Sequence, residues 1–503
     1  MNSGSLAPAP TASPARAGIL QKSFSFPTAI AALLAVLGVL TVRDRFDDPD
    51  MWWHLKLGEV TWTSHRIPSA DLFSYTTNHH SRIAQEWLSQ LLIYAAFKAG
   101  GYSGLMIWLC LFTAAILIAG YAVCSAYSGN AKVAFFGALT IWVLGTSGFA
   151  VRPQMVGYLL LILELLILHL GRSRNPRWYL ALPPLFALWA NCHSSFFLGL
   201  VLAASILFSS WSSFEAGLLV ASRWKPDDRR MLAVGLLLSL LTVCLNPSGV
   251  NLIGYPLDTM FHQPTVLSAV SEWQPLQLTD PRGIALLAAL TAIVLLVIVR
   301  RQELLLHEAL TIALAIWIAG SHRRLVFPAG ILIAPILSRL LANSWDRYRA
   351  ERDHPAANAV LIASSFLVIV LAFPSRPNLI AQVEDSSPVK AVEFIQAQHL
   401  SGPMLNDWDD GGYLIWAAPE YPVFIDGRAD VYQWTGVIDE FGRWATLQTA
   451  PDLLLDKYHV NFCLLERTSA VANVLPLLPN WKAVYSDARS VIFVRTPPAS
   501  PTR

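Results

Sequence analysis

Two clusters of polar residues flank a long hydrophobic stretch of the chain. The first, at positions 47–54, reads Asp-Asp-Pro-Asp-Met-Trp-Trp-His, and the second, at 407–413, reads Asp-Trp-Asp-Asp-Gly-Gly-Tyr. A carboxylate that is held in place can accept a proton from a reacting group. The two clusters therefore indicate an active site, provided that the elements between them bring both to the same side of the molecule.

The first cluster has the pattern of a helix start. Asp48 can cap a helix whose first residue is Pro49, a position where the missing N–H of proline costs nothing. Asp50 and His54 are then four residues apart on one helix face, with the two tryptophans between them turned elsewhere, where they suit a membrane interface or a sugar ring. The alternative is a simple cap followed by an aromatic belt. Because a cap does not require three carboxylates within four residues, the pattern favours a functional site.

The elements that must position these clusters are membrane spans. Of the 503 residues 54% are apolar and 14% are charged, a composition too hydrophobic for a soluble protein of this size. Stretches of about 17 or more nearly uncharged residues recur, long enough to cross a bilayer as helix. We count about eleven, at 26–42, 103–125, 132–150, 154–170, 178–192, 195–212, 231–245, 283–299, 304–320, 325–342 and 357–374.

The distribution of basic residues predicts the orientation. Arginine and lysine gather in the connections at 172–177, 223–230, 300–301 and 347–352, which share one side only if the N-terminus is cytoplasmic. Residues 1–25 then form a disordered cytoplasmic tail. The first apolar run lacks a small-residue cleavage site and is expected to remain as an anchor. An odd number of spans places the C-terminus outside.

The same count puts the other conspicuous polar residues on the outer face. They are the first loop at 43–102, Arg152, His193, the loop at 246–282, Arg323 and Arg324. Positive charge on this side opposes the usual distribution, which suggests an anionic ligand. For Arg152 or Arg324 taken alone, a side chain that snorkels at a helix end is the favoured explanation.

Two glutamates in these outer loops are further candidates. Glu86 begins an amphipathic helix that ends at Gly100 and Gly101. It is either a second carboxylate of the site or an acid that complements the helix dipole. Glu272, in the later loop, is assigned to substrate contact.

After position 374 the composition becomes mixed, and residues 375–503 are expected to form an extracytoplasmic α/β domain. Helices are predicted at 389–399 and 452–458, and strands at 404–406, 423–426, 460–465, 481–485 and 491–494. Asp426 and Arg428 lie at the end of one predicted strand. They form either a turn that faces a ligand or an ordinary Asp-Gly turn with an ion pair.

These motifs resemble those of the GT-C superfamily of membrane glycosyltransferases. Asp48-Pro49 is similar to the Asp-Pro of oligosaccharyltransferase catalytic subunits, and the Asp48 and Asp50 pair resembles the Asp-Glu of the protein mannosyltransferase and aminoarabinose transferase branch. Residues 408–411, Trp-Asp-Asp-Gly, resemble the oligosaccharyltransferase Trp-Trp-Asp-Tyr-Gly element but lack its first Trp and its Tyr. Most of the chain, from 47–101 onward, also resembles a bacterial family of uncharacterised multispan proteins.

The resemblance implies an inverting glycosyltransferase of about eleven helical spans in a bacterial plasma (inner) membrane. It would move a sugar from a polyprenyl-phosphate carrier to a glycan, lipid or protein acceptor, with Asp48 or Asp50 as base or ligand of a divalent cation such as Mg²⁺ or Mn²⁺. The leaving phosphate needs positive charge nearby, for which Arg152, His193, Arg323 and Arg324 are candidates. The other expected substrate contacts are His54, Glu86, Glu272, Asp409, Asp410, Asp426 and Arg428.

Other signals narrow the function. The five cysteines show neither zinc spacing nor an outer pair for a disulfide, no Gly-Lys phosphate loop is present, and a net charge of +2 gives no nucleic-acid signal. The alternative function is a non-catalytic transporter or envelope-assembly protein whose outer domain binds glycan or lipid. A transporter should carry charges at mid-span, whereas the few ionisable residues near spans, Glu164, His169, His307 and Glu308, lie toward the inner ends.

Overall fold

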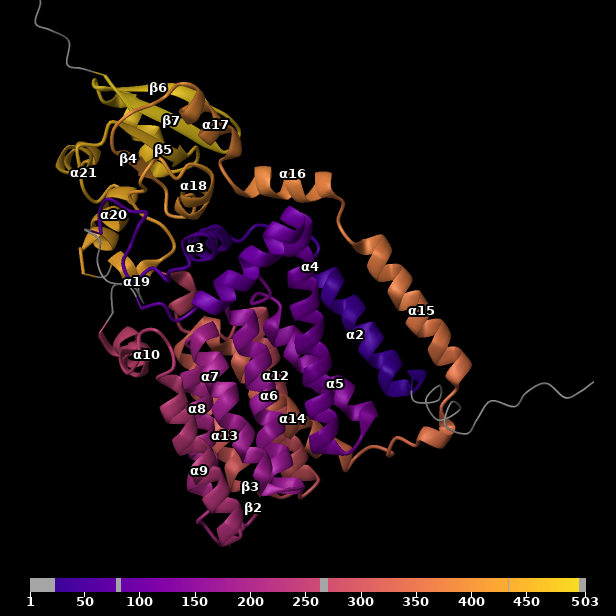
Figure 1. Cartoon of the computed structure of the whole chain (residues 1–503). Coiled ribbons are helices and arrows are strands. Elements are labelled where there is room, and N and C mark those ends of the chain that lie inside the picture. The colour runs from indigo at the N-terminus through magenta and orange to yellow at the C-terminus, as the bar shows by residue number, and fades with distance from the viewer. Residues whose placement is uncertain (1–22, 78–82, 263–269, 433, 497–503) are drawn as a thin grey trace, which may run out of the picture.

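The computed structural model of the chain describes residues 23–77, 83–262, 270–432 and 434–496. A bundle of long helices carries a smaller C-terminal part with a four-stranded sheet at one end (Figure 1). Most of the expected N-terminal tail and a part of the expected outer loop, 263–269, lie outside the described residues.

A helix overlaps each of the eleven apolar ranges predicted from the sequence. In chain order these helices are α2 (Phe26–Val42), α4 (Trp87–Ser128), α5 (Ala131–Gly145), α6 (Gln154–Ser173), α7 (Leu182–Cys192), α8 (Phe196–Ser209), α9 (Pro226–Val243), α12 (Pro281–Val299), α13 (Leu306–Ser321), α14 (Val326–Ala342) and α15 (Pro355–Ala372). Between them lie α3 (Asp50–Ser64), α10 (Asn251–His262) and the 3₁₀ turns η1 (Pro176–Ala181), η2 (Ser271–Trp273), η3 (Arg323–Leu325) and η4 (Ala350–Arg352).

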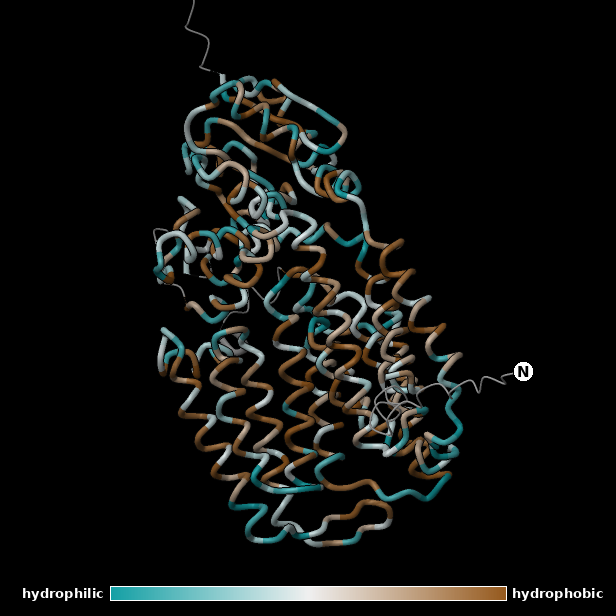
Figure 2. Tube along the Cα trace, turned by 45° about the vertical axis from the view of Figure 1, so that its right-hand side comes forward, coloured by the Kyte–Doolittle hydropathy of each residue, from teal (hydrophilic) through white to brown (hydrophobic). Residues whose placement is uncertain are grey.

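Among the residues that the structure describes, five helices are long and apolar enough to cross a membrane: α4, α6, α12, α14 with η3, and α15. Their surroundings differ, because 78% of the apolar stretch of α14 is buried inside the protein but only 11% of that of α15. A helix that is apolar all round and lies at the periphery needs a hydrocarbon environment. Figure 2 shows that hydrophobic residues predominate along the helices of the bundle.

Helix α4 contains the predicted break between an amphipathic helix and a span. Gly101 has φ +58° and ψ −139°, so the helical path is interrupted at this residue. A left-handed φ suits glycine, which has no Cβ to clash with the backbone. The amphipathic N-terminal part of α4 can therefore pack against α3 while the rest enters the bundle.

The C-terminal part contains the sheet β4 (Met404–Asn406), β5 (Phe462–Glu466), β7 (Ser490–Arg495) and β6 (Trp481–Ser486), in that spatial order. Strands β4 and β5 are parallel, and the other two pairs are antiparallel. The surrounding helices are α16 (Arg376–Ser386), α17 (Val389–Ala397), α18 (Gly411–Ala417), α19 (Ala429–Tyr432), α20 (Val437–Ala445), α21 (Pro451–Lys457), α22 (Ala470–Val474) and the turn η5 (Leu475–Leu477).

The strand predicted at 423–426 is wrong. Val423 makes only an isolated bridge with Ser74 of the first loop, and the Asn406 side chain accepts the backbone N–H of Phe424 at 2.8 Å. Loop and side-chain partners thus satisfy backbone groups that a β-strand would otherwise pair. A second, small sheet that the sequence did not predict joins β1 (Phe214–Ala216), β2 (Leu219–Ala221) and β3 (Leu304–Leu305) at the far end of the bundle (Figure 1).

The C-terminal part packs directly on the first loop. The rings of Trp52 in α3 and Tyr413 in α18 meet edge to face, with centroids 5.0 Å apart. Gly412 lies so close to the Pro49 carbonyl that a Cβ at this position would collide with it. The two polar clusters of the sequence, separated by about 350 residues, are therefore neighbours in the fold.

Candidate functional site

A cavity of about 260 Å³ opens where the helix bundle meets the C-terminal part. Its polar wall includes Asp50, His54, Glu86, Arg152, His193 and Arg324. Its apolar wall comes from α8 and α13 with the start of α14, through Phe197, Leu198, Val201, Leu314, Trp317, Ile318 and Pro328. The cavity therefore joins a charged pocket to a hydrophobic surface between helices.

Arg152 is at the centre of the charged wall. It precedes α6, and its side chain is nearly buried. Its guanidinium lies 2.5 Å from Asp48, 3.0 Å from Asp50 and 3.4 Å from Glu272. Burial lowers the pKa of Arg152, but the three carboxylates outweigh burial and hold the pKa well above its usual value. The group is a permanent cation that three acids share.

The two candidate bases occupy different positions. The Asp48 carboxylate accepts the backbone N–H of Asp50 at 2.9 Å, which helps to fix the start of α3. Asp50 lines the cavity and accepts the indole N–H of Trp53 at 3.0 Å. Burial, followed by the negative charges of Asp48 and Glu272, raises the pKa of Asp50 to about 6 even though Arg152 opposes the shift.

The membrane-interface position suggested for the two tryptophans is wrong, whereas Trp53 lines the cavity. Trp53 is bound to Asp50 and stacks on His54, with ring centroids 3.5 Å apart. Trp52 is 1% exposed because it packs under the C-terminal part. Both rings are buried, so neither is available to the membrane interface. The prediction failed because the residues that cover this face are distant in the sequence.

Glu86 links two histidines on the opposite side of the cavity. Its carboxylate lies 3.9 Å from the ring of His54 and 3.6 Å from that of His193. His193 also lies 2.8 Å from the hydroxyl of Ser195. Burial, and then the charge of Arg324, lower the pKa of His193 to about 3. His193 is therefore neutral at pH 7 and cannot supply positive charge there. Glu86 also stands at the N-cap position of α4, so it both adjoins the cavity and faces the helix dipole.

Glu272 and Arg324 complete the charged group. Arg324 donates to the Gln154 side chain at 2.7 Å and lies 3.7 Å from Glu272. Burial raises the pKa of Glu272, but Arg324 and Arg152 together outweigh it and hold that pKa below its ordinary value. Arg323 points instead to Asp280, 3.0 Å away, and lines an adjoining cavity of about 230 Å³ that Glu272 and Arg324 also line.

The acidic residues of the second cluster lie above this group. Asp410 is buried and pairs with Arg489 at 2.7 Å. Desolvation raises the pKa of Asp409 although the charge of Arg489 opposes the shift, and Arg152 and Asp48 contribute less. Asp409 does not itself line the cavity, and Asp410 is tied to the sheet through Arg489.

Asp426 and Arg428 form an ion pair in the interior. Arg428 donates to Asp426 at 2.6 Å and also contacts Asp71 of the first loop, and all three are at most 1% exposed. The hydroxyl of Tyr432 donates to Asp426 at 2.5 Å. The geometry favours the ion-pair interpretation over a ligand-facing turn, although residues 427–430 border the cavity.

Three residues that the sequence did not single out belong to the site. Gln154 anchors Arg324, Trp273 stacks on the same guanidinium at 5.6 Å, and Asp71 holds Arg428. Gln154 lies two positions after Arg152, and this proximity is the one signal in the sequence that points to it. An acid such as Asp71 in a Ser- and Thr-rich loop gives no distinguishing pattern.

The fold of the chain is similar to that of solved membrane proteins. The oligosaccharyltransferase of Archaeoglobus fulgidus, tethered to an acceptor peptide with the NVT sequon, superposes with a TM-score of 0.55 at 13% identity over 88% of this chain and 70% of that one. ArnT from Cupriavidus metallidurans bound to undecaprenyl phosphate gives a TM-score of 0.51 at 14% identity over 94% and 98% of the two chains. No family model and no curated protein matches the sequence.

The chain is a multi-pass membrane protein with the fold of the GT-C glycosyltransferases. The resemblance drawn from Asp48, Asp50 and the 408–411 motif is confirmed at the level of the fold. The likeness to a family of uncharacterised bacterial proteins is not matched by a family model.

Proposed function

We propose that the protein is an inverting glycosyltransferase that moves a sugar from a polyprenyl-phosphate carrier to a glycan, lipid or protein acceptor at the outer face of a bacterial plasma membrane. The carrier follows from the cavity, where an apolar wall on α8 and α13 adjoins Arg152 and Arg324. The GT-C fold supports it, since one neighbour was solved with undecaprenyl phosphate and another with dolichol-phosphate.

The single observation that carries the proposal is the placement of Asp50. It is the aspartate of the first cluster that lines the cavity, and its nearest cation is Arg152. With a pKa of about 6, its carboxyl is mostly ionised at pH 7 and can accept the proton of an attacking hydroxyl. We therefore assign the base to Asp50 and a positioning role to Asp48, which orients Asp50 and Arg152.

Arg152 and Arg324 then stabilise the phosphate that leaves from C1 of the sugar. Attack from the face opposite this phosphate inverts the anomeric carbon. Neutral His193 and the acids Glu86 and Asp409 contact sugar or acceptor hydroxyls by hydrogen bonds. Displacement within one cavity needs no covalent intermediate on the enzyme.

A divalent cation such as Mg²⁺ or Mn²⁺ would have to share these carboxylates with Arg152. Among the described residues no three His, Cys, Asp or Glu side chains are grouped so as to hold a metal. Arg152 lies against both Asp48 and Asp50. We expect a chelator to leave transfer unchanged, because Arg152 already neutralises these carboxylates.

The topology that completes the proposal has about eleven spans. Residues 1–25 form a cytoplasmic tail, 26–374 the membrane domain with its outer loop at 43–102, and 375–503 an extracytoplasmic α/β domain. Arginine-rich connections at 172–177 and 223–230 lie at the end of the bundle away from the cavity, which supports this orientation.

The test is transfer from radiolabelled polyprenyl-phosphate sugars in membranes that contain matched amounts of wild type, Asp50→Asn, Asp48→Asn or Asp44→Asn. Asp44 is an exposed acid of the same loop and serves as the control. We expect Asp50→Asn to lower transfer by about 10²–10⁴-fold, the usual contribution of a general base. Asp48→Asn should lower it less and Asp44→Asn not at all.

Two results would count against the proposal. Transfer by Asp50→Asn at the wild-type rate would remove Asp50 as the base. The non-catalytic alternative would be supported if the wild type transferred from no donor, while the wild type, Asp48→Asn and Asp50→Asn all bound lipid or glycan equally.

A further inference from the structure

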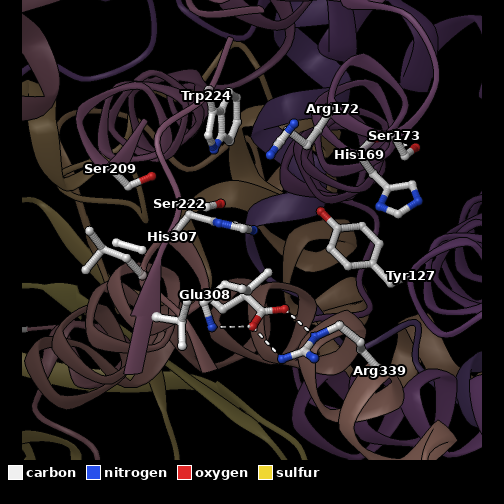
Figure 3. Close-up of a pocket in the computed structure, with 14 residues that line it drawn as sticks. Tyr127, His169, Arg172, Ser173, Ser209, Ser222, Trp224, His307, Glu308 and Arg339 are labelled. Atoms are coloured by element: carbon white, nitrogen blue, oxygen red, sulfur yellow. Dashed lines mark hydrogen bonds and ion pairs between the residues drawn. The ribbon is translucent and has the colours of Figure 1, made fainter. Parts of the chain in front are cut away.

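A second polar cavity lies at the opposite end of the bundle. It has a volume of about 200 Å³ and is lined by the ends of α6, α8, α13 and α14 together with the small β1–β2–β3 sheet (Figure 3). Gln154 of the first cavity and Arg172 of the second belong to the same helix, α6, and their separation of 18 residues corresponds to about 27 Å. The two cavities therefore cannot share one head group.

The unengaged polar groups of this cavity are hydrogen-bond donors. The guanidinium of Arg172 stacks over the ring of Trp224 at 4.6 Å and has one ion-pair partner, Asp228, at 3.6 Å. Within the described residues, neither the indole N–H of Trp224 nor the imidazole of His307 has a hydrogen-bond partner. The Ser222 hydroxyl joins them at the rim. Figure 3 shows Arg172, Trp224 and His307 around one space.

The carboxylate of Glu308 and two serine hydroxyls at this site are already engaged. The Glu308 carboxylate accepts hydrogen bonds from two nitrogens of Arg339, at 2.5 and 2.6 Å. It also accepts the backbone N–H of Leu305 at 3.0 Å. The hydroxyls of Ser173 and Ser209 donate to backbone carbonyls of their own helices. The charges of Glu308 and Arg339 cancel, which leaves Arg172 as the cation that faces the space, only weakly engaged by Asp228.

We propose that this cavity binds the phosphate group of an anionic ligand. An Arg guanidinium with indole, imidazole and hydroxyl donors around it matches the acceptor oxygens of a phosphate and offers no free carboxylate to repel them. The phosphate belongs either to a lipid head group in the leaflet at this end or to a free anion in the adjoining solution. The proposal does not depend on the transferase reaction at the other end.

The experiment measures binding to the purified full-length protein in neutral detergent. The probes are ³²P-labelled inorganic phosphate, by equilibrium dialysis, and radiolabelled phosphatidic acid, with phosphatidylcholine as the lipid without a phosphomonoester. The variants are Arg172→Gln, Trp224→Phe, and Arg230→Gln as the control. Arg230 is an exposed arginine at the start of α9, six residues after Trp224, and it does not line the cavity.

We expect one saturable site for at least one probe. Loss of a charged hydrogen-bond donor should weaken binding about tenfold or more in Arg172→Gln, and loss of the neutral N–H about threefold in Trp224→Phe. Arg230→Gln should bind as the wild type does. Trp224→Phe keeps the stacked ring, so it remains informative if Arg172→Gln fails to fold. Binding of phosphatidic acid alone would assign the site to a lipid, and binding of inorganic phosphate to a soluble anion.

The proposal is overturned if neither probe binds saturably or if Arg172→Gln and Trp224→Phe both retain wild-type affinity. Asp50→Asn should leave this binding unchanged, which separates the result from the fate of the proposed transferase.

Discussion

The charge balance around Arg152 leads to a quantitative prediction for Arg152→Gln. The nitrogen–oxygen distance to Asp50 is 3.0 Å, so the charge centres are about 4 Å apart. At an effective dielectric constant of 20 this attraction is about 4 kcal/mol, and each 1.36 kcal/mol corresponds to one pKa unit. Because Arg152 favours the ionised carboxyl, its removal should raise the pKa of Asp50 from about 6 by about 2 to 3 units.

This shift has a direct kinetic consequence. A carboxyl with a pKa of about 6 is about 90% ionised at pH 7, whereas one near 8 to 9 is about 1 to 10% ionised. If Asp50 is the base, transfer at pH 7 by Arg152→Gln should fall about 10- to 100-fold from ionisation alone. The activity lost in this way should return at alkaline pH, which loss of the fold would not allow.

The assay combines the pH profile of transfer with pH-difference infrared spectroscopy of the carboxyl groups, using Asp50→Asn to identify the Asp50 signal. Arg323→Gln is the matched control, because Arg323 pairs with Asp280 and is 46% exposed. The infrared measurement does not require the donor sugar to be known. An Asp50 midpoint that stays near pH 6 in Arg152→Gln would refute the electrostatic reasoning, even if transfer were reduced.

Three further predictions concern the joint between the two parts of the chain. Arg428→Met should lower the free energy of unfolding by about 3 to 5 kcal/mol, since it leaves buried carboxylates without their partner, and urea denaturation of the purified protein measures this. Gly427→Ala should lower transfer at least about tenfold, because the added Cβ would meet the Asp50 carboxylate, whereas Gly442→Ala, which meets nothing, should not. Burial raises the pKa of Asp407 from 3.8 to about 7. The folded state therefore holds this proton more tightly, and stability should fall as pH rises from about 4 to 7, a slope that Asp407→Asn should reduce.

Each of these has a contrary outcome. Unchanged urea midpoints in Arg428→Met would show that the pair is replaceable. Equal transfer by Gly427→Ala and Gly442→Ala would show that the site tolerates movement of Asp50. A stability profile of Asp407→Asn parallel to that of the wild type would assign the pH dependence to other groups.

The hydrophobic pattern predicted the helices well because a long apolar helix is visible as an uninterrupted run of apolar residues in the sequence. The range 26–42 coincides with α2, and the break expected at Gly101 is present as a left-handed residue within α4. The strand expected at 423–426 failed for the opposite reason. Its apolar residues are buried, but their backbone partners come from Asn406 and from the first loop, which local sequence cannot reveal.

The site was predictable in its composition but not in its pairings. Two carboxylates of one loop and an arginine on the same face could be expected to meet, and Arg152 does contact both Asp48 and Asp50. The sequence could not show that Arg428 forms an ion pair with Asp71, or that burial lowers the pKa of His193 and leaves it uncharged. Both depend on burial, which is set by residues far away in the chain.

The contact between the two polar clusters also bears on how the protein is made. Gly412 and Arg428 reach the first loop from the last quarter of the chain, so Asp50 has its final surroundings only after that segment has been synthesised and has folded onto the first loop. Until then the nascent chain holds its membrane helices but an unfinished pocket. A chain interrupted before this segment would therefore hold the helices of the bundle but lack the completed pocket around Asp50.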